Sequence, residues 1–235
     1  MAAYEHKVWP KDVDFTRGQT LTALSDCILQ SAGEDADAGG FGVVHLSARN
    51  ATWVLSRFAV EIERRLAEHE RFTITTWVES LDRIFTTRHH RVCDGNGQTV
   101  ARATTLWSVI DLTTRKPMSL EWLDNCATEP CDIGMARPLR LRPLASYQEQ
   151  ETRSVRYSDI DFNGHTNTVR YIGWMLDTID TERFRSQTIR RLDANFIKES
   201  VLGQRLTLKT DRHQDTDSFI VIDQTPVMLA SIEWR

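Results

Sequence analysis

The chain has 235 residues, of which 40% are hydrophobic, and a formal net charge of -4. This length suits one large domain or two small ones with a real apolar core, and the small negative charge provides no general attraction to nucleic acid or anionic membranes. No basic leader opens the sequence, no apolar run approaches the ~20 residues that span a bilayer, and the four cysteines are too few for a disulfide framework, so we expect a cytoplasmic protein without a membrane-inserted segment.

The first part of the chain predicts one helix followed by antiparallel strands. Asp14-Phe15 opens a polar turn, after which apolar residues recur at helical spacing from Leu21 to Gln30. Polar and apolar residues then alternate over 72–78, 83–92 and 99–110, which is typical of strands. The dipeptides Asp94-Gly95 and Asn96-Gly97 predict a hairpin turn between the last two.

The middle of the chain predicts a linker. Residues 113–150 lose periodicity and contain Pro117, Pro130, Pro138 and Pro143. Cys126 and Cys131 lie here without a companion pair of metal ligands.

The second part predicts the same order of elements. A short strand over 154–157 precedes the turn dipeptide Asn163-Gly164, and a helix over 168–179 follows, with Thr166, Asn167 or Thr168 as its N-cap. Alternating runs over 205–209, 219–223 and 227–234 predict strands. Each half therefore contains a strand, a helix and then several antiparallel strands.

The two halves also match residue by residue. Asp14-Phe15 and its turn correspond to Asp161-Phe162, and residues 57–76 align with residues 191–210 without a gap. The first half has additional residues between helix and strand, which we assign to 39–46. A repeated helix with a meander of strands predicts an α+β fold in which two antiparallel sheets each wrap a helix.

Groups suited to catalysis are concentrated before the second helix. Asp161, Asn163 and His165 occupy alternate positions there, close to the unpaired N–H groups and positive dipole end of the helix N-terminus. Each residue alone has a structural interpretation as a turn cap, a turn residue or a surface histidine. Other patterns indicate no cofactor: His89 and His90 face opposite sides of a strand, and no glycine-rich phosphate loop occurs.

The sequence resembles the acyl-acyl carrier protein (acyl-ACP) thioesterases over nearly its whole length. The resemblance is carried by DIDFNGHTNTVRYIGW, by SRFAVEIE in the first half and by NFIKES at 195–200, in this order. It implies a tandem, or double, hotdog fold in one chain. By matching motifs it also implies a catalytic set of Asp161, Asn163, His165 and Glu199, the last on a strand of the same half.

One departure from the family bears on mechanism. Plant members have a cysteine directly after that glutamate, whereas this chain has Ser200. A cysteine nucleophile is therefore not expected, and no feature marks Ser200 as an activated nucleophile. We expect a carboxylate-assisted attack of water, with His165 as general base and either Asp161 or Glu199 orienting it or activating the water. Asn163 would position the water, and N–H groups of the helix N-terminus would polarise the thioester carbonyl.

The first half lacks these groups. Thr16 and Gly18 stand where the second half has Asn163 and His165, and Arg65 stands opposite Glu199. We expect residues 1–112 to form a non-catalytic hotdog unit that shapes the acyl pocket, with Trp53, Leu55 and Phe58 as apolar walls or plain core. Residues 113–150 would be the linker, and 151–235 the catalytic unit.

The resulting expectation is a thioesterase that releases fatty acid from acyl carrier protein, as a monomer or homodimer, without a cofactor. Because carrier proteins are acidic, arginines are candidates for docking them. These are Arg137, Arg140 and Arg142 in one group and Arg183, Arg185, Arg190 and Arg191 in another. Two alternatives remain open: an acyl-CoA thioesterase of the same fold, and a non-catalytic acyl-binding module.

Overall fold

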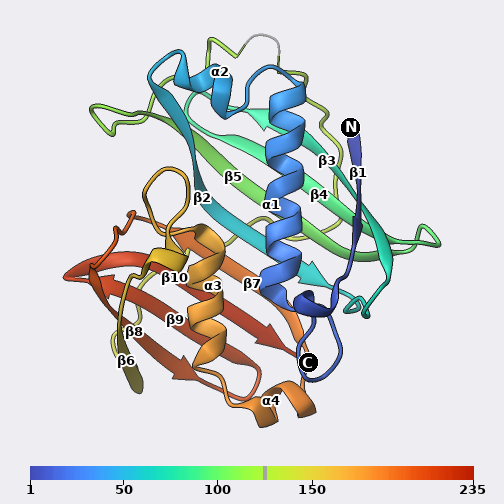
Figure 1. Ribbon diagram of the computed structural model, residues 1–235, viewed down its shortest axis with the longest axis vertical. Coiled ribbons are helices and arrows are strands. Elements are labelled where there is room, and N and C mark those ends of the chain that lie inside the picture. The colour runs from blue at the N-terminus through green and yellow to red at the C-terminus, as the bar shows by residue number, and fades with distance from the viewer. Residues whose placement is uncertain (124–125) are drawn as a thin grey trace. The chain divides into compact units, whose positions relative to one another are not determined.

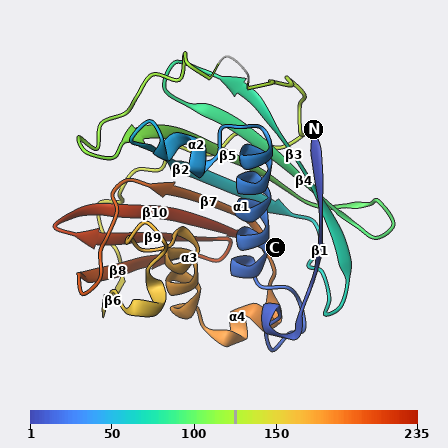
Figure 2. The ribbon, with the colours of Figure 1, turned by 45° about the horizontal axis from the view of Figure 1, so that its top comes forward.

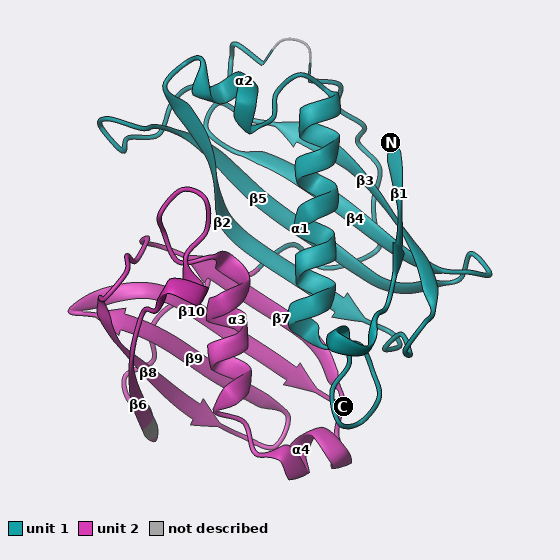
Figure 3. Ribbon diagram, in the orientation of Figure 1, with its two compact units in different colours: residues 1–138 teal, residues 139–235 magenta. Residues whose placement is uncertain are grey.

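The computed structural model describes residues 1–123 and 126–235 and divides into two compact units, residues 1–138 and 139–235 (Figure 3). The boundary falls inside the stretch 113–150. No helix in the described part is long and apolar enough to cross a bilayer.

The first unit is an antiparallel sheet with a long helix across one face (Figures 1 and 2). Its strand order is β1-β3-β4-β5-β2. In chain order its elements are β1 (Ala2–Lys7), the 3-10 turn η1 (Pro10–Asp12), α1 (Leu21–Ala38), α2 (Val43–Ser47), β2 (Ala51–Ile62), β3 (Arg71–Leu81), β4 (Thr86–Asp94) and β5 (Thr99–Asp111).

The helix of the first unit is longer than expected. The sequence predicted its end near Gln30, but α1 continues to Ala38, because buried Ser31, Ala32 and Ala36 extend its inner face with small residues that an apolar pattern does not reveal. The additional length of the first half thus lies largely in α1, which has 18 residues against 10 in the helix of the second unit. The assignment of that length to 39–46 was incomplete.

The second unit repeats the arrangement. Its strand order is β7-β10-β9-β8-β6, all antiparallel, and α3 lies across the sheet (Figure 1). Its elements are β6 (Glu149–Ser154), the 3-10 turn η2 (Tyr157–Asp159), α3 (Thr168–Asp177), α4 (Thr181–Ser186), β7 (Ile189–Phe196), β8 (Arg205–Arg212), β9 (Thr216–Asp223) and β10 (Thr225–Trp234).

The prediction of a strand over 154–157 was wrong. The strand β6 ends at Ser154, and Tyr157 begins η2, because the Asp159 carboxylate accepts the backbone N–H of Arg156 at 2.8 Å and turns the chain. The predicted helix and later strands are confirmed, with Asn167 as the N-cap: its side chain accepts the Val169 N–H at 2.8 Å. Ile172 and Met175 of the predicted apolar stripe are fully buried.

The interior of the first unit contains charge as well as apolar side chains. Phe58, one of the expected pocket walls, is fully buried core. Arg88 on β4 pairs with Asp35 on α1 at 2.5 Å and joins helix to sheet. His90 is also fully buried, with Nε2 3.2 Å from the Thr105 hydroxyl, and burial together with Arg88 and His89 lowers its pKa well below the usual range.

We expect acidification to destabilise the protein through His90. Since its folded pKa is depressed, the unfolded chain binds a proton that the folded chain does not between that pKa and about pH 6.5. The stability provided by the neutral imidazole is complete above the unfolded pKa and is lost as the pH falls. Urea unfolding should show a decrease of up to about 1.4 kcal/mol per pH unit for each such histidine below pH 6.5.

The matched variant is His90→Gln, which keeps a hydrogen-bonding group near Thr105 but does not titrate. Its unfolding free energy should depend less steeply on pH than that of the wild type. A residual slope is expected from His6 and His89, because burial also lowers the pKa of each. Identical slopes for both proteins would contradict the assignment to His90.

Candidate active site

The turn before α3 is organised around the Asp161 carboxylate. Its Oδ1 accepts the backbone N–H of Asn163 at 2.8 Å and of His165 at 3.3 Å. The Asp161 N–H in turn donates to the His165 carbonyl at 2.8 Å, and Gly164 adopts φ +79°, a conformation that glycine tolerates best. Asp161 therefore uses Oδ1 to shape the backbone of the turn, and its carboxylate makes no hydrogen bond to the imidazole in the described structure.

A second set of hydrogen bonds ties the turn to its neighbours. Thr166 N–H donates to the Ser200 carbonyl and Asn167 N–H to the Asp159 carbonyl, each at 2.8 Å. The first of these bonds brings the loop after β7 against the turn before α3. As a result His165 and Glu199, which precede Thr166 and Ser200 in sequence, become neighbours.

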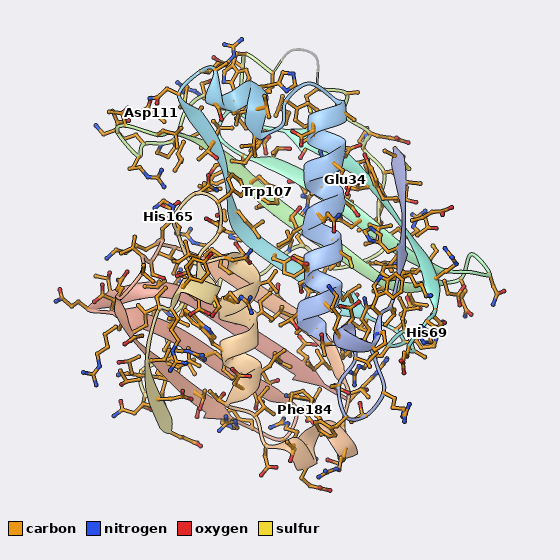
Figure 4. All side chains as sticks on the ribbon, viewed as in Figure 1. Glu34, His69, Trp107, Asp111, His165 and Phe184 are labelled. Carbon is orange, nitrogen blue, oxygen red and sulfur yellow. The ribbon has the colours of Figure 1, made fainter. Side chains whose placement is uncertain are left out.

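His165 and Glu199 lie close together in the site. The distance from His165 Nε2 to Glu199 Oε2 is 3.5 Å, and the side chains are 26% and 39% exposed. The other ring nitrogen, Nδ1, is buried and has no hydrogen-bond partner in the described part of the chain. Figure 4 labels His165 in the turn that leads into α3. The pair is thus partly open to solvent and close to the helix N-terminus.

Contrary to expectation, Glu199 does not lie on a strand. The strand β7 ends at Phe196, because the backbone N–H groups of Ile197 and Lys198 both donate to the Val227 carbonyl, and Glu199 belongs to the loop that follows. Asn163 is exposed, and its backbone N–H donates to the Asp161 carboxylate. The structure brings Asp161, His165 and Glu199 together and leaves Asn163 exposed in the same turn.

Ser200 is not placed as a nucleophile. It is fully buried, and its hydroxyl lies 2.6 Å from the Thr166 hydroxyl and 2.6 Å from the Tyr171 hydroxyl. No imidazole or carboxylate contacts that hydroxyl among the described residues, so no general base is in place to activate it. The motif analysis missed this cluster of hydroxyls. The repeat contained a signal for it, since the matched positions of Ser200 and Tyr171 in the first half are Leu66 and Leu24.

The matched turn of the first unit has the same backbone. Asp14 accepts the Thr16 N–H at 2.8 Å, Asp14 N–H donates to the Gly18 carbonyl at 3.1 Å, and Gln19 N–H donates to the Leu66 carbonyl at 2.7 Å. These bonds correspond one by one to those of Asp161, His165 and Thr166. The repeat predicted from sequence is confirmed at the level of individual hydrogen bonds.

Arg65 occupies the space of the missing imidazole in that turn. Its guanidinium donates to the Asp14 carboxylate and the Gly18 carbonyl, each at 2.5 Å, and to Thr16 and Gln19. Burial acts to raise the pKa of Asp14, but the hydrogen bonds from Thr16 and Arg65 outweigh it and lower the pKa. A Cβ added at Gly18 would lie 2.7 Å from the Arg65 guanidinium carbon. A histidine at this position would therefore require the Arg65 guanidinium to move and to lose its hydrogen bonds to Asp14 and Gly18.

Other reactive groups lie elsewhere. The four cysteines are free, and burial raises the pKa of Cys27 to about 11 and also raises that of Cys126. A raised pKa reduces the thiolate fraction at neutral pH. Within residues 1–123 and 126–235 no group of three or more His, Cys, Asp or Glu side chains is arranged to hold a metal ion.

The chain matches known proteins along most of its length. The family model for the acyl-ACP thioesterase N-terminal domain matches residues 2–124, and that for the C-terminal domain matches residues 144–234. The crystal structure of an acyl-ACP thioesterase from Bacteroides thetaiotaomicron is similar with a TM-score of 0.92 and 33% identity, covering 100% of this chain and 97% of that one. The 12:0-ACP thioesterase from Umbellularia californica shares the fold, with a TM-score of 0.87 at 19% identity over 99% of this chain and 97% of its own.

Curated plant relatives are longer. The oleoyl-acyl carrier protein thioesterase of Coriandrum sativum is 25% identical over 228 residues, which are 89% of this chain and 62% of the relative. The dodecanoyl-[acyl-carrier-protein] hydrolase of Cinnamomum camphora is 25% identical over 219 residues, 83% of this chain and 56% of the relative. The chain thus spans less than two thirds of these proteins.

We expect Gly18→Ala to destabilise the protein. The new methyl group would displace the Arg65 guanidinium, which cannot move without losing its hydrogen bonds to Asp14 and Gly18. The loss should be about 1 to 3 kcal/mol in urea unfolding. Gly33→Ala is the matched control, because nothing lies within 4 Å of its added Cβ in α1 and alanine favours a helix by up to about 1 kcal/mol.

The attribution to Arg65 is checked in the background Arg65→Ala. There Gly18→Ala should cost much less, since the colliding group is absent. An equal cost in both backgrounds would show that Arg65 is not the reason for glycine at this position.

Proposed function

The chain belongs to the acyl-ACP thioesterase family, and we propose on this basis that it hydrolyses the thioester between a fatty acyl group and acyl carrier protein. The observation that supports the proposal best is the contact of His165 Nε2 with Glu199 Oε2 at 3.5 Å in a partly exposed turn. An imidazole beside a carboxylate is a suitable acid–base pair near neutral pH.

In the proposed reaction the pair removes a proton from water. The water oxygen then attacks the carbonyl carbon, the carbon–sulfur bond breaks, and the pair returns the proton to the leaving thiolate. Glu199 takes the role of partner to the imidazole, since Asp161 binds the backbone of the turn. Asp161 and the turn it shapes therefore hold His165 in place. The exposed Asn163 contacts the attacking water.

The oxyanion donor is proposed at the start of α3. Val169 N–H is used by the Asn167 cap at 2.8 Å, and Arg170 N–H donates to the Asn167 carbonyl at 2.9 Å. Among the described residues the Thr168 N–H has no hydrogen-bond acceptor, and we propose it as the donor to the thioester oxygen. The positive end of the helix dipole favours the negative charge that develops on that oxygen.

We also propose that the chain is a tandem hotdog that acts in the cytoplasm. Residues 151–235 carry the chemistry, residues 1–112 contribute to selection of the acyl chain, and residues 113–150 connect the two. Support for the division of labour comes from the first unit, where Arg65 fills the matched turn. An engineered second active site at Thr16 and Gly18 is not expected for the same reason.

Five of the seven candidate docking arginines already have a carboxylate partner. Arg137 pairs with Glu79 at 2.8 Å, Arg183 with Asp217 at 2.9 Å, Arg185 with Glu182 at 3.2 Å and Arg190 with Glu233 at 3.0 Å, and Arg191 is buried against Asp193. Arg140 and Arg142 are exposed and form no ion pair within the described residues. We propose these two as contacts for the acidic carrier.

The proposed activity is tested by measuring hydrolysis across acyl lengths on acyl carrier protein and on CoA. We expect turnover on acyl-ACP, and His165→Ala should lower kcat by roughly 10²- to 10⁴-fold with little change in KM, because the imidazole acts in the transition state. His213→Ala is a control, since His213 is exposed and pairs with Asp211 away from the turn.

Turnover on acyl-CoA alone would replace the proposal with an acyl-CoA thioesterase. No turnover on either substrate would favour the acyl-binding module. Near wild-type kcat in a folded His165→Ala protein would remove His165 from the mechanism.

We also expect hydrolysis without any cysteine. Replacing all four with alanine should leave kcat within about 3-fold of wild type, apart from packing losses that lower stability. The physical reason is that burial raises the pKa of Cys27 and Cys126 and disfavours their thiolates. Loss of turnover in a stable single variant would instead identify that cysteine as a nucleophile.

A further inference from the structure

We propose that Ser200 is a positioning residue that, through Thr166 and Tyr171, holds the Glu199 carboxylate beside His165. The inference rests on the proposed function for its catalytic consequence, although its structural part can be tested separately. Ser200 is fully buried, whereas its neighbours in the loop, residues 197–199 and 201–203, are exposed.

The contacts of Ser200 join three elements of the second unit. Its carbonyl accepts the Thr166 N–H at 2.8 Å and the Thr166 hydroxyl at 3.3 Å, both from the turn before α3. Its hydroxyl lies 2.6 Å from Thr166 Oγ1 and 2.6 Å from the Tyr171 oxygen on α3. Glu199 and His165 are the residues immediately before Ser200 and Thr166, so these bonds fix the spacing between the two.

The directions of the hydroxyl protons follow from the bonding. Thr166 Oγ1 donates to the Ser200 carbonyl, and it therefore accepts the proton of the Ser200 hydroxyl. Ser200 Oγ then accepts the proton of Tyr171, whose pKa is raised mainly by burial. Each hydroxyl proton has an acceptor, and the Ser200 proton points toward Thr166 and away from any base. This arrangement suits an anchor and is unsuited to a nucleophile.

The first unit provides an internal comparison. Its matched turn keeps the backbone bond, from Gln19 N–H to the Leu66 carbonyl at 2.7 Å, but has Leu66 and Leu24 where the second unit has Ser200 and Tyr171. Both leucines are buried. The fold of the turn is therefore satisfied by the backbone bond and apolar packing. The hydroxyl cluster is an addition in the unit that has the imidazole and the carboxylate.

The hydroxyl cluster fixes the position of the loop more precisely than apolar packing would. A buried hydroxyl cluster has directional bonds that fix one arrangement, whereas apolar packing tolerates small shifts. Loss of alignment by about 1 Å at a catalytic centre can reduce the rate about 100-fold. The Glu199 side chain is 39% exposed and directly precedes Ser200 in the same loop, so a shift of the loop backbone moves its carboxylate relative to His165.

The test compares Ser200→Ala with Ser200→Cys and Thr166→Val. Ser200→Ala should lower kcat by roughly 10- to 100-fold with KM within about 3-fold of wild type. Ser200→Cys should retain more activity, because a thiol is a weak hydrogen-bonding group in the same place. Thr166→Val should resemble Ser200→Ala. Thr104→Val is the matched control for Thr166→Val and should leave kcat unchanged. It also removes a buried hydroxyl, one that contacts His89 in the first unit.

Coupling to Glu199 separates positioning from general loss of stability. In the background Glu199→Gln, Ser200→Ala should have no further effect on kcat, because the group that it positions has already been disabled. A merely structural role would give the same fold-loss in both backgrounds, and this result would overturn the proposal. Unchanged kcat in Ser200→Ala would also overturn it.

A readout that does not depend on turnover completes the test. The crystal structure of Ser200→Ala should show the Glu199 carboxylate displaced from His165 Nε2, and an unchanged contact near 3.5 Å would contradict the inference. If the wild-type protein hydrolyses neither acyl-ACP nor acyl-CoA, the proposed function fails, while this structural comparison still decides whether Ser200 positions Glu199.

Discussion

One backbone hydrogen bond, from the Thr166 N–H to the Ser200 carbonyl at 2.8 Å, brings the candidate catalytic residues of the second unit together. It joins the turn before α3 to the loop after β7, and so makes neighbours of two residues 34 positions apart. The same bond, from Gln19 to Leu66, recurs in the first unit at 2.7 Å. Since both turns share this geometry, the difference between the units lies in their side chains.

The two turns have the same backbone hydrogen bonds but place different side chains around their aspartate. Each turn is built around an aspartate whose carboxylate binds backbone N–H groups. In the first unit the Arg65 guanidinium compensates Asp14 and occupies the space beside Gly18. In the second unit His165 and Glu199 stand at the matched positions of Gly18 and Arg65, and the buried His165 Nδ1 has no hydrogen-bond partner among the described residues. The first turn therefore contains an ion pair with a structural role, whereas the second contains groups suited to acid–base chemistry.

The repeat made much of this predictable from the sequence. It placed Asp161 and His165 in one turn and paired Arg65 with the position of Glu199, because local turn chemistry and an ungapped match are visible in residue order. The errors have physical reasons. Tyr157 was assigned to a strand because the alternating pattern does not show the local turn that Asp159 forms with the Arg156 N–H, and α1 was cut short because its last buried residues are small. The bonds among Thr166, Tyr171 and Ser200 depend on distances across elements, which periodicity does not contain.

In the proposed reaction water, activated by His165 and Glu199, attacks the thioester directly. A single turnover in H₂¹⁸O, followed by rapid quenching and mass spectrometry of the protein and the released fatty acid, distinguishes this reaction from covalent catalysis. We expect one ¹⁸O atom in the released fatty acid, none in the peptide that contains Glu199 and no acylated protein. An acyl group on Glu199, Ser200 or a cysteine, or ¹⁸O incorporated into Glu199, would contradict it.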